Sequence, residues 1–365
     1  MGFSIGIIGL PNVGKTTIFN AITSICAEAS NYPFCTIEPN VGVVPVKDER
    51  LEKIKEIIKT ESYLPTTITF IDIAGLVRGA NKGEGLGNKF LSHIREVDGI
   101  AHVIRCFDQP EVVHVEGTVD PVRDVEVIKT ELILSDLEII ERRMEKLAKI
   151  NTPSAKKVYS VLIKLSEILN NGKALSDFSE LFSSLTDEER GQIEELNLIS
   201  IKPLFYIANV SENELKEKKY LPKLLDYAAK EGREVVVISG RLEEEMTQFD
   251  EEERQSMLME YGIEKEAVER IIITGYKLLD LITFFTTARK ELKAWTLKRG
   301  EKAVEAAGKI HSDMERGFIR AEVIHYDDLL KAGSEHKARE LGLYRLEGKD
   351  YEIRDGDIVY FRFKV

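Results

Sequence analysis

The sequence predicts a doubly wound α/β domain with an inserted helical hairpin, followed by a small α+β module. Short apolar runs alternate with helix-compatible stretches, as they do in a mostly parallel sheet covered by helices. A long amphipathic stretch interrupts this alternation, and beyond residue 280 the pattern changes to short strands and turns. At 365 residues the chain is longer than one hydrophobic core usually serves, so more than one domain is expected.

The first apolar run, FSIGII at residues 3–8, leads into a glycine-rich turn and then the helix-compatible stretch TTIFNAITSI. This order predicts a strand, a loop and a helix. Later runs share the same apolar character and are separated by helical patterns. They lie at residues 67–73, 99–107, 203–210 and 234–240. Runs of this kind predict the buried strands of one parallel sheet.

The inserted stretch carries a heptad-like seam. Its apolar residues Ile133, Leu137, Ile140, Met144 and Leu147 are spaced by four, three, four and three positions. The sequence Asn-Thr-Pro after residue 150 breaks this seam, and a second seam follows. We expect an antiparallel hairpin within an insertion at about residues 128–198. It serves either as a solvated spacer or as a docking arm for a large partner.

The C-terminal stretch contains GFIRAEVIHY and YEIRDGDIVYFRF, which alternate as strands do and include a tight Asp-Gly-Asp turn. We therefore divide the chain into residues 1–280 and 281–365. The second part has slightly more basic than acidic residues, whereas the first carries the acidic excess. A polyanionic partner is more compatible with the second part.

Composition narrows the class of protein. The chain is 43% hydrophobic and 31% charged, as in ordinary folded proteins. Its net charge of -12 argues against coating of nucleic acid and gives no support for sequence-specific DNA binding. No apolar run approaches the roughly 20 residues that span a bilayer, and the N-terminus lacks signal-peptide features, so we expect a cytoplasmic protein without a membrane partner. Three cysteines without metal-ligand spacing, Cys26, Cys35 and Cys106, are expected to be reduced, packed thiols.

The segment GLPNVGKT matches G-x-x-x-x-G-K-[ST] and lies between a predicted strand and a predicted helix. Gly9 and Gly14 allow backbone N–H groups to face phosphates, with the helix dipole adding to the attraction. Lys15 is expected to neutralise phosphate charge during catalysis, and Thr16 to offer its hydroxyl to Mg²⁺. The other residues expected to contact the nucleotide here are Asn12, Val13 and Thr17.

A second element, D-x-x-G, follows the strand TITFIDI. Asp72 is placed to hold Mg²⁺ through water, and the Gly75 amide to sense a γ-phosphate. Thr36 lies between the two elements, where a switch threonine would close over the metal. Together these elements predict Mg²⁺-nucleotide binding and a switch that depends on the γ-phosphate.

The base-reading element departs from that of Ras-like GTPases, which carry [NT]-K-x-D. Here the chain has Asn209, Val210, Ser211 and Glu212. Glutamate is longer than the aspartate that pairs with guanine, and valine lacks the lysine stem that covers the base, so guanine recognition should be weakened. Adenine can be read by backbone groups near Val210, although Glu212 binding guanine remains the alternative. The following loop, with Ser239 and Gly240, is expected to contact the base.

With these motifs assembled, the chain resembles the YchF branch of the Obg-related P-loop proteins, also called Obg-like ATPases. The resemblance covers NVGKTT, DIAGLVRGANKGEGLGNKFL, the NVSE element, the hairpin, and the C-terminal AAGKIHSDMERGFIRAEVI with RLEGKDYEIRDGDIVYFRF. The C-terminal block looks like a TGS domain. The resemblance implies a Ras-like P-loop domain, ATP preferred over GTP, slow hydrolysis, and association with ribosomes or ribosomal subunits.

The residue that positions the attacking water is not obvious. Leu76 occupies the place of the glutamine that orients water in Ras-type sites, so intrinsic hydrolysis should be slow. We favour His114, in a predicted loop, because an imidazole can position water; a packing role is the alternative. Arg78 either stabilises charge or lies on a mobile surface. Two functions remain open: an ATP-driven switch, or a nucleotide-stabilised adaptor in which hydrolysis is incidental.

Overall fold

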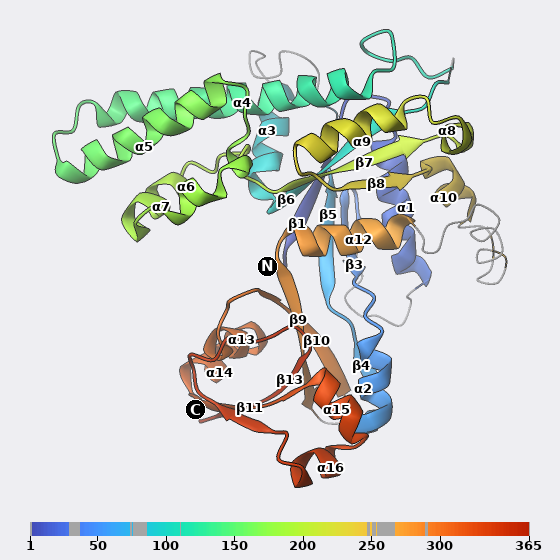
Figure 1. Cartoon of the computed structure of the whole chain (residues 1–365), viewed down its shortest axis with the longest axis vertical. Helices are drawn as coiled ribbons and strands as arrows, with labels where there is room; N and C mark the ends of the chain where they lie inside the picture. Colours follow the sequence, from blue (N-terminus) through green and yellow to red (C-terminus); the bar gives the residue numbers. More distant parts are fainter. Residues whose placement is uncertain are drawn as a thin grey trace.

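The computed structural model describes residues 2–28, 37–73, 75, 86–109, 111–246, 249, 253, 267–288 and 291–364. Within these ranges no helix is both long and apolar enough to cross a bilayer. Two sheets organise the molecule, and a helical arm extends from the first of them (Figure 1).

The first sheet has seven strands, and its central strands are buried and parallel, as the apolar runs predicted. Among the described strands of this sheet, only the pairings of β2 with β3 and of β3 with β5 are antiparallel. Every residue of β6 is buried, including the polar His102 and Arg105, which explains why the run is otherwise apolar. In sheet order the strands are β2 (Ile37–Glu38), β3 (Val41–Pro45), β5 (Thr67–Asp72), β1 (Ser4–Ile8), β6 (Gly99–Cys106), β7 (Leu204–Val210) and β8 (Val235–Ile238).

Helices cover both faces of this sheet, which confirms the predicted doubly wound α/β class (Figure 1). One face packs against α1 (Lys15–Glu28) and α12 (Ala267–Leu278). The other packs against α3 (Leu86–Glu96), α9 (Leu221–Lys230) and the first half of α4. Two short helices, α8 (Glu212–Glu217) and α10 (Gly240–Met246), follow β7 and β8.

The predicted hairpin is present and is made by α4 (Pro121–Leu147) and α5 (Pro153–Asn170). Thr152 caps α5 by accepting a hydrogen bond from the Ala155 amide, and Pro153 begins the helix. The two predicted seams meet in a separate apolar core that includes Ile140 and Leu165. Three short elements return the chain to the sheet: η1 (Leu175–Asp177), α6 (Ser179–Ser183) and α7 (Asp187–Glu194).

The second sheet has six strands and is covered by helices on both faces. Its strand order is β12 (Arg345–Glu347), β11 (Phe318–His325), β13 (Asp357–Phe363), β9 (Leu281–Ala288), β10 (Glu291–Lys298) and β4 (Ser62–Leu64). The covering helices are α13 (Ala303–Ile310) and α14 (Ser312–Arg316) on one face, and α15 (Tyr326–Ala332), α16 (Glu335–Glu340) and α2 (Arg50–Ile58) on the other.

This second unit, here called the C-terminal module, therefore also draws on residues 50–64 from the first part of the chain. Strand β4 pairs in parallel with β10, and Leu51 of α2 is buried in the module's core. The Arg50 guanidinium donates to the Asp355 carboxylate at 2.9 Å. The domain boundary at residue 281 remains a prediction. In the structure, the contacts of residues 50–64 with the C-terminal module cross this boundary.

Candidate nucleotide-binding site

The phosphate loop lies between β1 and α1, at the carboxyl edge of the first sheet. Gly14 has φ +91°, and a Cβ there would lie 2.2 Å from the Asn209 side-chain nitrogen. A Cβ on Gly9 would lie 2.6 Å from the Val103 carbonyl oxygen. Gly9 is therefore required by the close approach of the Val103 backbone, and Gly14 by its positive φ and the nearby Asn209 side chain.

The Lys15 side chain is buried and its ammonium donates to the Leu10 carbonyl at 2.9 Å, within the same loop. Burial lowers the pKa of Lys15, and the nearby Asp72 carboxylate opposes this. A Cβ on Gly75 would lie 3.0 Å from the Lys15 ammonium. The structure thus brings Lys15 and Gly75 together, although they belong to two separate motifs.

Thr16 and Asp72 form the candidate metal site. The Thr16 hydroxyl donates to Asp72 Oδ2 at 2.9 Å, while the buried Asp72 Oδ1 has no hydrogen-bond partner within the described ranges. Burial raises the pKa of Asp72, against the opposing effects of Thr16 and Lys15. A hydroxyl beside a carboxylate with a free oxygen suits Mg²⁺, which prefers oxygen ligands. Thr36, the third predicted ligand, lies outside the described residues.

The base-reading element begins at the end of β7. The buried Asn209 side chain donates to the Val13 carbonyl at 2.9 Å and accepts from the Gly240 amide at 3.1 Å. Thr17 is close to the same loop, since its methyl carbon lies 3.3 Å from where a Cβ of Gly240 would be. Asn209 therefore clamps the phosphate loop to the loop after β8.

The rest of the base-reading element lies at the start of α8. The Val210 side chain is 3% exposed and belongs to an apolar cluster, so it packs beneath the loop. Ser211 caps α8 by accepting from the Glu214 amide at 3.3 Å, and Glu212 is the first helical residue. In the next loop, the Ser239 hydroxyl accepts from the Leu242 amide at 3.4 Å, where α10 begins.

His114 is buried at 7% exposure, and both of its ring nitrogens have partners. Its Nδ1 accepts from the Glu116 amide at 3.1 Å, so Nε2 carries the proton and donates to Asp124 Oδ2 at 2.8 Å. The Asn12 side chain donates to the Val113 carbonyl at 3.1 Å. The loop bearing His114 is thus tied both to α4 and to the phosphate loop. Leu76 and Arg78, the other residues considered for hydrolysis, lie outside the described residues.

Sequence reasoning missed Arg105, whose side chain organises this loop from the end of β6. Arg105 is 1% exposed, and its guanidinium donates to the carbonyls of Phe107 at 3.1 Å and Val112 at 3.0 Å. It also stacks over the Phe107 ring at 4.5 Å. The signal that could have found it is the one arginine in the mostly apolar run GIAHVIRCF.

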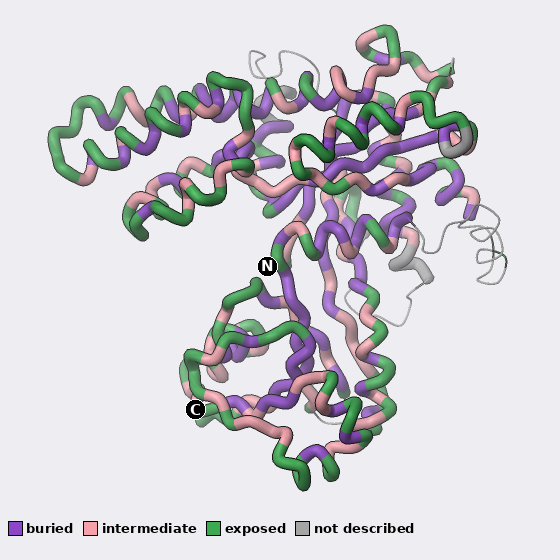
Figure 2. The backbone as a smooth tube through the Cα atoms, in the orientation of Figure 1, coloured by how far each residue is buried: buried purple, intermediate pink, exposed green. Residues whose placement is uncertain are grey.

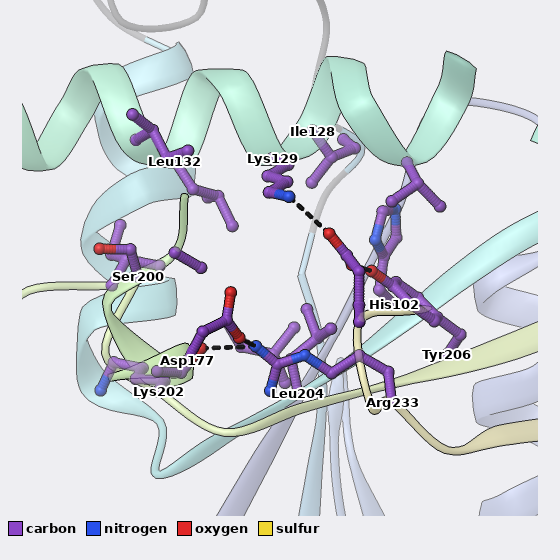
Figure 3. Close-up of a pocket in the computed structure, with 17 residues that line it drawn as sticks. His102, Ile128, Lys129, Leu132, Asp177, Ser200, Lys202, Leu204, Tyr206 and Arg233 are labelled. Carbon is purple, nitrogen blue, oxygen red and sulfur yellow. Dashed lines mark hydrogen bonds and ion pairs between the residues drawn. The ribbon is translucent and has the colours of Figure 1, made fainter. Parts of the chain in front are cut away.

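A separate small cavity of about 50 Å³ lies at the root of the hairpin (Figure 3). Two ion pairs border it, Lys129 with Glu231 and Arg233 with Asp177. His102 also lines it, and burial, assisted by the Lys15 charge, lowers the pKa of His102 to about 3, so its imidazole is neutral. The volume suits a few water molecules, and the cavity contains no part of the phosphate loop.

The glycine-rich loop, its lysine, the Thr16–Asp72 pair and the sheet topology define a P-loop nucleotide-binding protein of Ras-like architecture. Comparison with known families agrees. The family "50S ribosome-binding GTPase" matches residues 4–156, and the C-terminal family of YchF GTPases, described as "Protein of unknown function (DUF933)", matches residues 281–364.

Full-length relatives specify the family. The chain is 50% identical to "Ribosome-binding ATPase YchF" of Haemophilus influenzae and 47% identical to the protein of that name from Bacillus subtilis, with all of each chain covered. The solved Schizosaccharomyces pombe YchF GTPase superposes with a TM-score of 0.87 at 38% identity, over 99% of this chain and 98% of the other. The chain belongs to the YchF family.

Proposed function

We propose that this protein is a cytoplasmic, Mg²⁺-dependent P-loop ATPase, weaker on GTP, that works as a nucleotide switch on the ribosome or its large subunit. The names of the bacterial relatives support both ATP hydrolysis and the ribosomal partner. The observation that carries the choice of ATP is the base-reading element. Val210 is a core residue with no stem to cover a base, and glutamate replaces aspartate at position 212.

In the proposed mechanism, Lys15 leaves the Leu10 carbonyl and donates to the β and γ oxygens of the triphosphate. Thr16 and Asp72 would hold Mg²⁺, which neutralises phosphate charge when bound. Gly75, beside Lys15, would offer its amide to the γ-phosphate and so report the triphosphate state.

His114 would position the attacking water. Because its Nε2 is engaged with Asp124, the loop must release that hydrogen bond before the imidazole can face the γ-phosphate. This requirement, together with Leu76 in place of glutamine, supports slow intrinsic hydrolysis.

GTP preference is the alternative, and it is favoured by the description of the family matched at residues 4–156. The test is competitive binding of ATP and GTP to nucleotide-free protein in Mg²⁺. We expect ATP to bind at least about tenfold more tightly, a difference of about 1.4 kcal/mol, and EDTA to remove most of the affinity. Tighter binding of GTP would overturn the proposal.

The decisive variant is Glu212→Asp, which shortens the side chain to that of a guanine-reading site and should move the preference toward GTP. Glu217→Asp makes the same change at an exposed position later in α8 and should leave the preference unchanged. Val210→Lys is less informative, because a lysine at this buried position would disturb the core. Pelleting with ribosomes in ATP, ADP or no nucleotide tests the switch, since equal affinities would leave only an adaptor.

A further inference from the structure

The far end of the helical hairpin concentrates positive charge in a chain whose net charge is -12. Glu145 is the only acidic residue between Arg142 and Lys164 in the sequence. The basic residues of this segment are Arg142, Arg143, Lys146, Lys149, Lys156, Lys157 and Lys164. The end of the hairpin is largely exposed (Figure 2).

Four of these residues form what we call the basic tip: Arg142, Lys146, Lys149 and Lys156. All four are exposed. Arg142 and Lys146 are four residues apart on α4 and share one side of the helix, whereas the buried Ile140 and Leu147 face α5. Lys149 lies in the turn and Lys156 near the start of α5.

The acidic helix α7 packs on α5 and reaches its first turn, where the Ser154 hydroxyl donates to the Glu188 carboxylate. On α4, Arg143 donates to the Gln192 side chain at 3.1 Å and lies 3.9 Å from Glu195. In the described part of the chain, Lys146, Lys149 and Lys156 have no ion-pair partner. Arg142 pairs only with Glu138, in an exposed contact within α4 that contributes little.

Fold stability accounts for only part of this charge. Lys146 and Lys149 are favourably placed near the C-terminus of α4, but Lys156 lies close to the N-terminus of α5, where a cation opposes the helix dipole. The cluster also repels itself. The hydrophobic core between α4 and α5 holds these ammonium groups on a rigid arm that extends away from both sheets (Figure 1).

We propose that the basic tip docks onto backbone phosphates of ribosomal RNA, an inference that rests on the proposed ribosomal function. Lysine binds phosphate as a point charge, and the tip offers no arrangement of aromatic and arginine side chains that would read bases. The exposed Ile150, at 48%, adds an apolar contact at the turn. Binding through the tip is therefore sequence-independent and weakened by salt.

The test compares two triple variants of the full chain. Lys146→Gln, Lys149→Gln and Lys156→Gln neutralise the tip. The control, Lys53→Gln, Lys223→Gln and Lys230→Gln, removes equal charge from exposed helical lysines that also lack an ion pair within the described residues. Surface changes of this kind leave stability within about 0.5 kcal/mol, which thermal unfolding and basal ATP turnover check.

Affinity for purified large ribosomal subunits is measured against salt concentration. Loss of three phosphate contacts lowers the slope of log affinity against log salt by about 2 to 3, and we expect at least a tenfold loss of affinity for the tip variant alone. The same loss is expected on protein-free ribosomal RNA. A loss on subunits but not on this RNA would assign the tip to a ribosomal protein and overturn the inference.

The remaining outcomes separate the two proposals. Wild-type binding with equal affinity and salt dependence in both triple variants overturns the docking surface and leaves the proposed function standing. Failure of the wild-type protein to bind either whole ribosomes or large subunits in any nucleotide state overturns the ribosomal function and the docking surface with it.

Discussion

Replacing Asn209 with alanine tests whether this residue clamps the nucleotide site or reads the base. The Asn209 side chain bridges the Val13 carbonyl at 2.9 Å and the Gly240 amide at 3.1 Å, and it is 5% exposed. Asn209→Ala removes both hydrogen bonds and leaves two backbone groups unpaired in a buried place. At about 1 to 2 kcal/mol for each, the free energy of unfolding should fall by about 2 to 4 kcal/mol.

The consequence for binding follows from the geometry. Asn209 joins the phosphate loop to the loop after β8, and both loops are expected to contact any bound nucleotide. Its loss therefore makes the relative position of the two loops less fixed. ATP and GTP should therefore weaken together, by at least about tenfold, with little change in their ratio. Titration calorimetry with each nucleotide and urea denaturation followed by circular dichroism measure the two effects.

Ser239→Ala is the matched control in the same region. Among the described residues, its hydroxyl takes part in one long hydrogen bond, which it accepts from the Leu242 amide at 3.4 Å, so the free energy of unfolding should change by less than about 1 kcal/mol. If Asn209→Ala instead changed the ATP-to-GTP ratio by tenfold or more at unchanged stability, the clamp interpretation would be refuted and direct base reading would replace it.

Two further predictions concern the hydrolysis loop and the domain boundary. His114→Ala should lower single-turnover ATP hydrolysis by about 100-fold, with nucleotide affinity nearly unchanged. Asp124→Asn should lower the free energy of unfolding and retain most of the turnover. Equal turnover in His114→Ala and wild type would leave His114 a packing residue. Residues 281–365 expressed alone should lack cooperative unfolding by circular dichroism, because β10 loses β4 and the core loses Leu51 and Ile54 of α2; a sharp transition would establish an independent domain.

Local patterns predicted several residues that the structure brings together at the candidate nucleotide site. The phosphate loop is continuous in sequence, so its glycines, Lys15 and Thr16 could be assigned from spacing alone. Asp72 could be assigned because parallel strands of a doubly wound sheet end at one edge, which brings the end of β5 beside the loop after β1. The pairing of Thr16 with Asp72 follows from this topology.

Contacts between distant segments could not be predicted in the same way. Strand β4 has three residues, and its sequence SYL carries no alternation that would distinguish it from a loop. Its partner β10 lies more than two hundred residues later, so only the folded chain reveals the pairing. The clamp by Asn209 was hidden for a different reason: an asparagine in this motif suggests base contact, and its partners are backbone groups that a sequence does not mark.

The path of residues 46–66 connects the nucleotide site to the C-terminal module. Strands β3 and β5 pair along their length in the first sheet, and the chain between them leaves that sheet to form α2 and β4. The Val46 amide donates to the Thr66 carbonyl at 2.8 Å, which holds the two ends of this segment together. Asp72 lies at the end of β5 that faces the nucleotide site. At the opposite end of the strand pair, α2 and β4 pack in the C-terminal module. The strand pair that ends near Asp72 is therefore joined through this one segment of the chain to the C-terminal module.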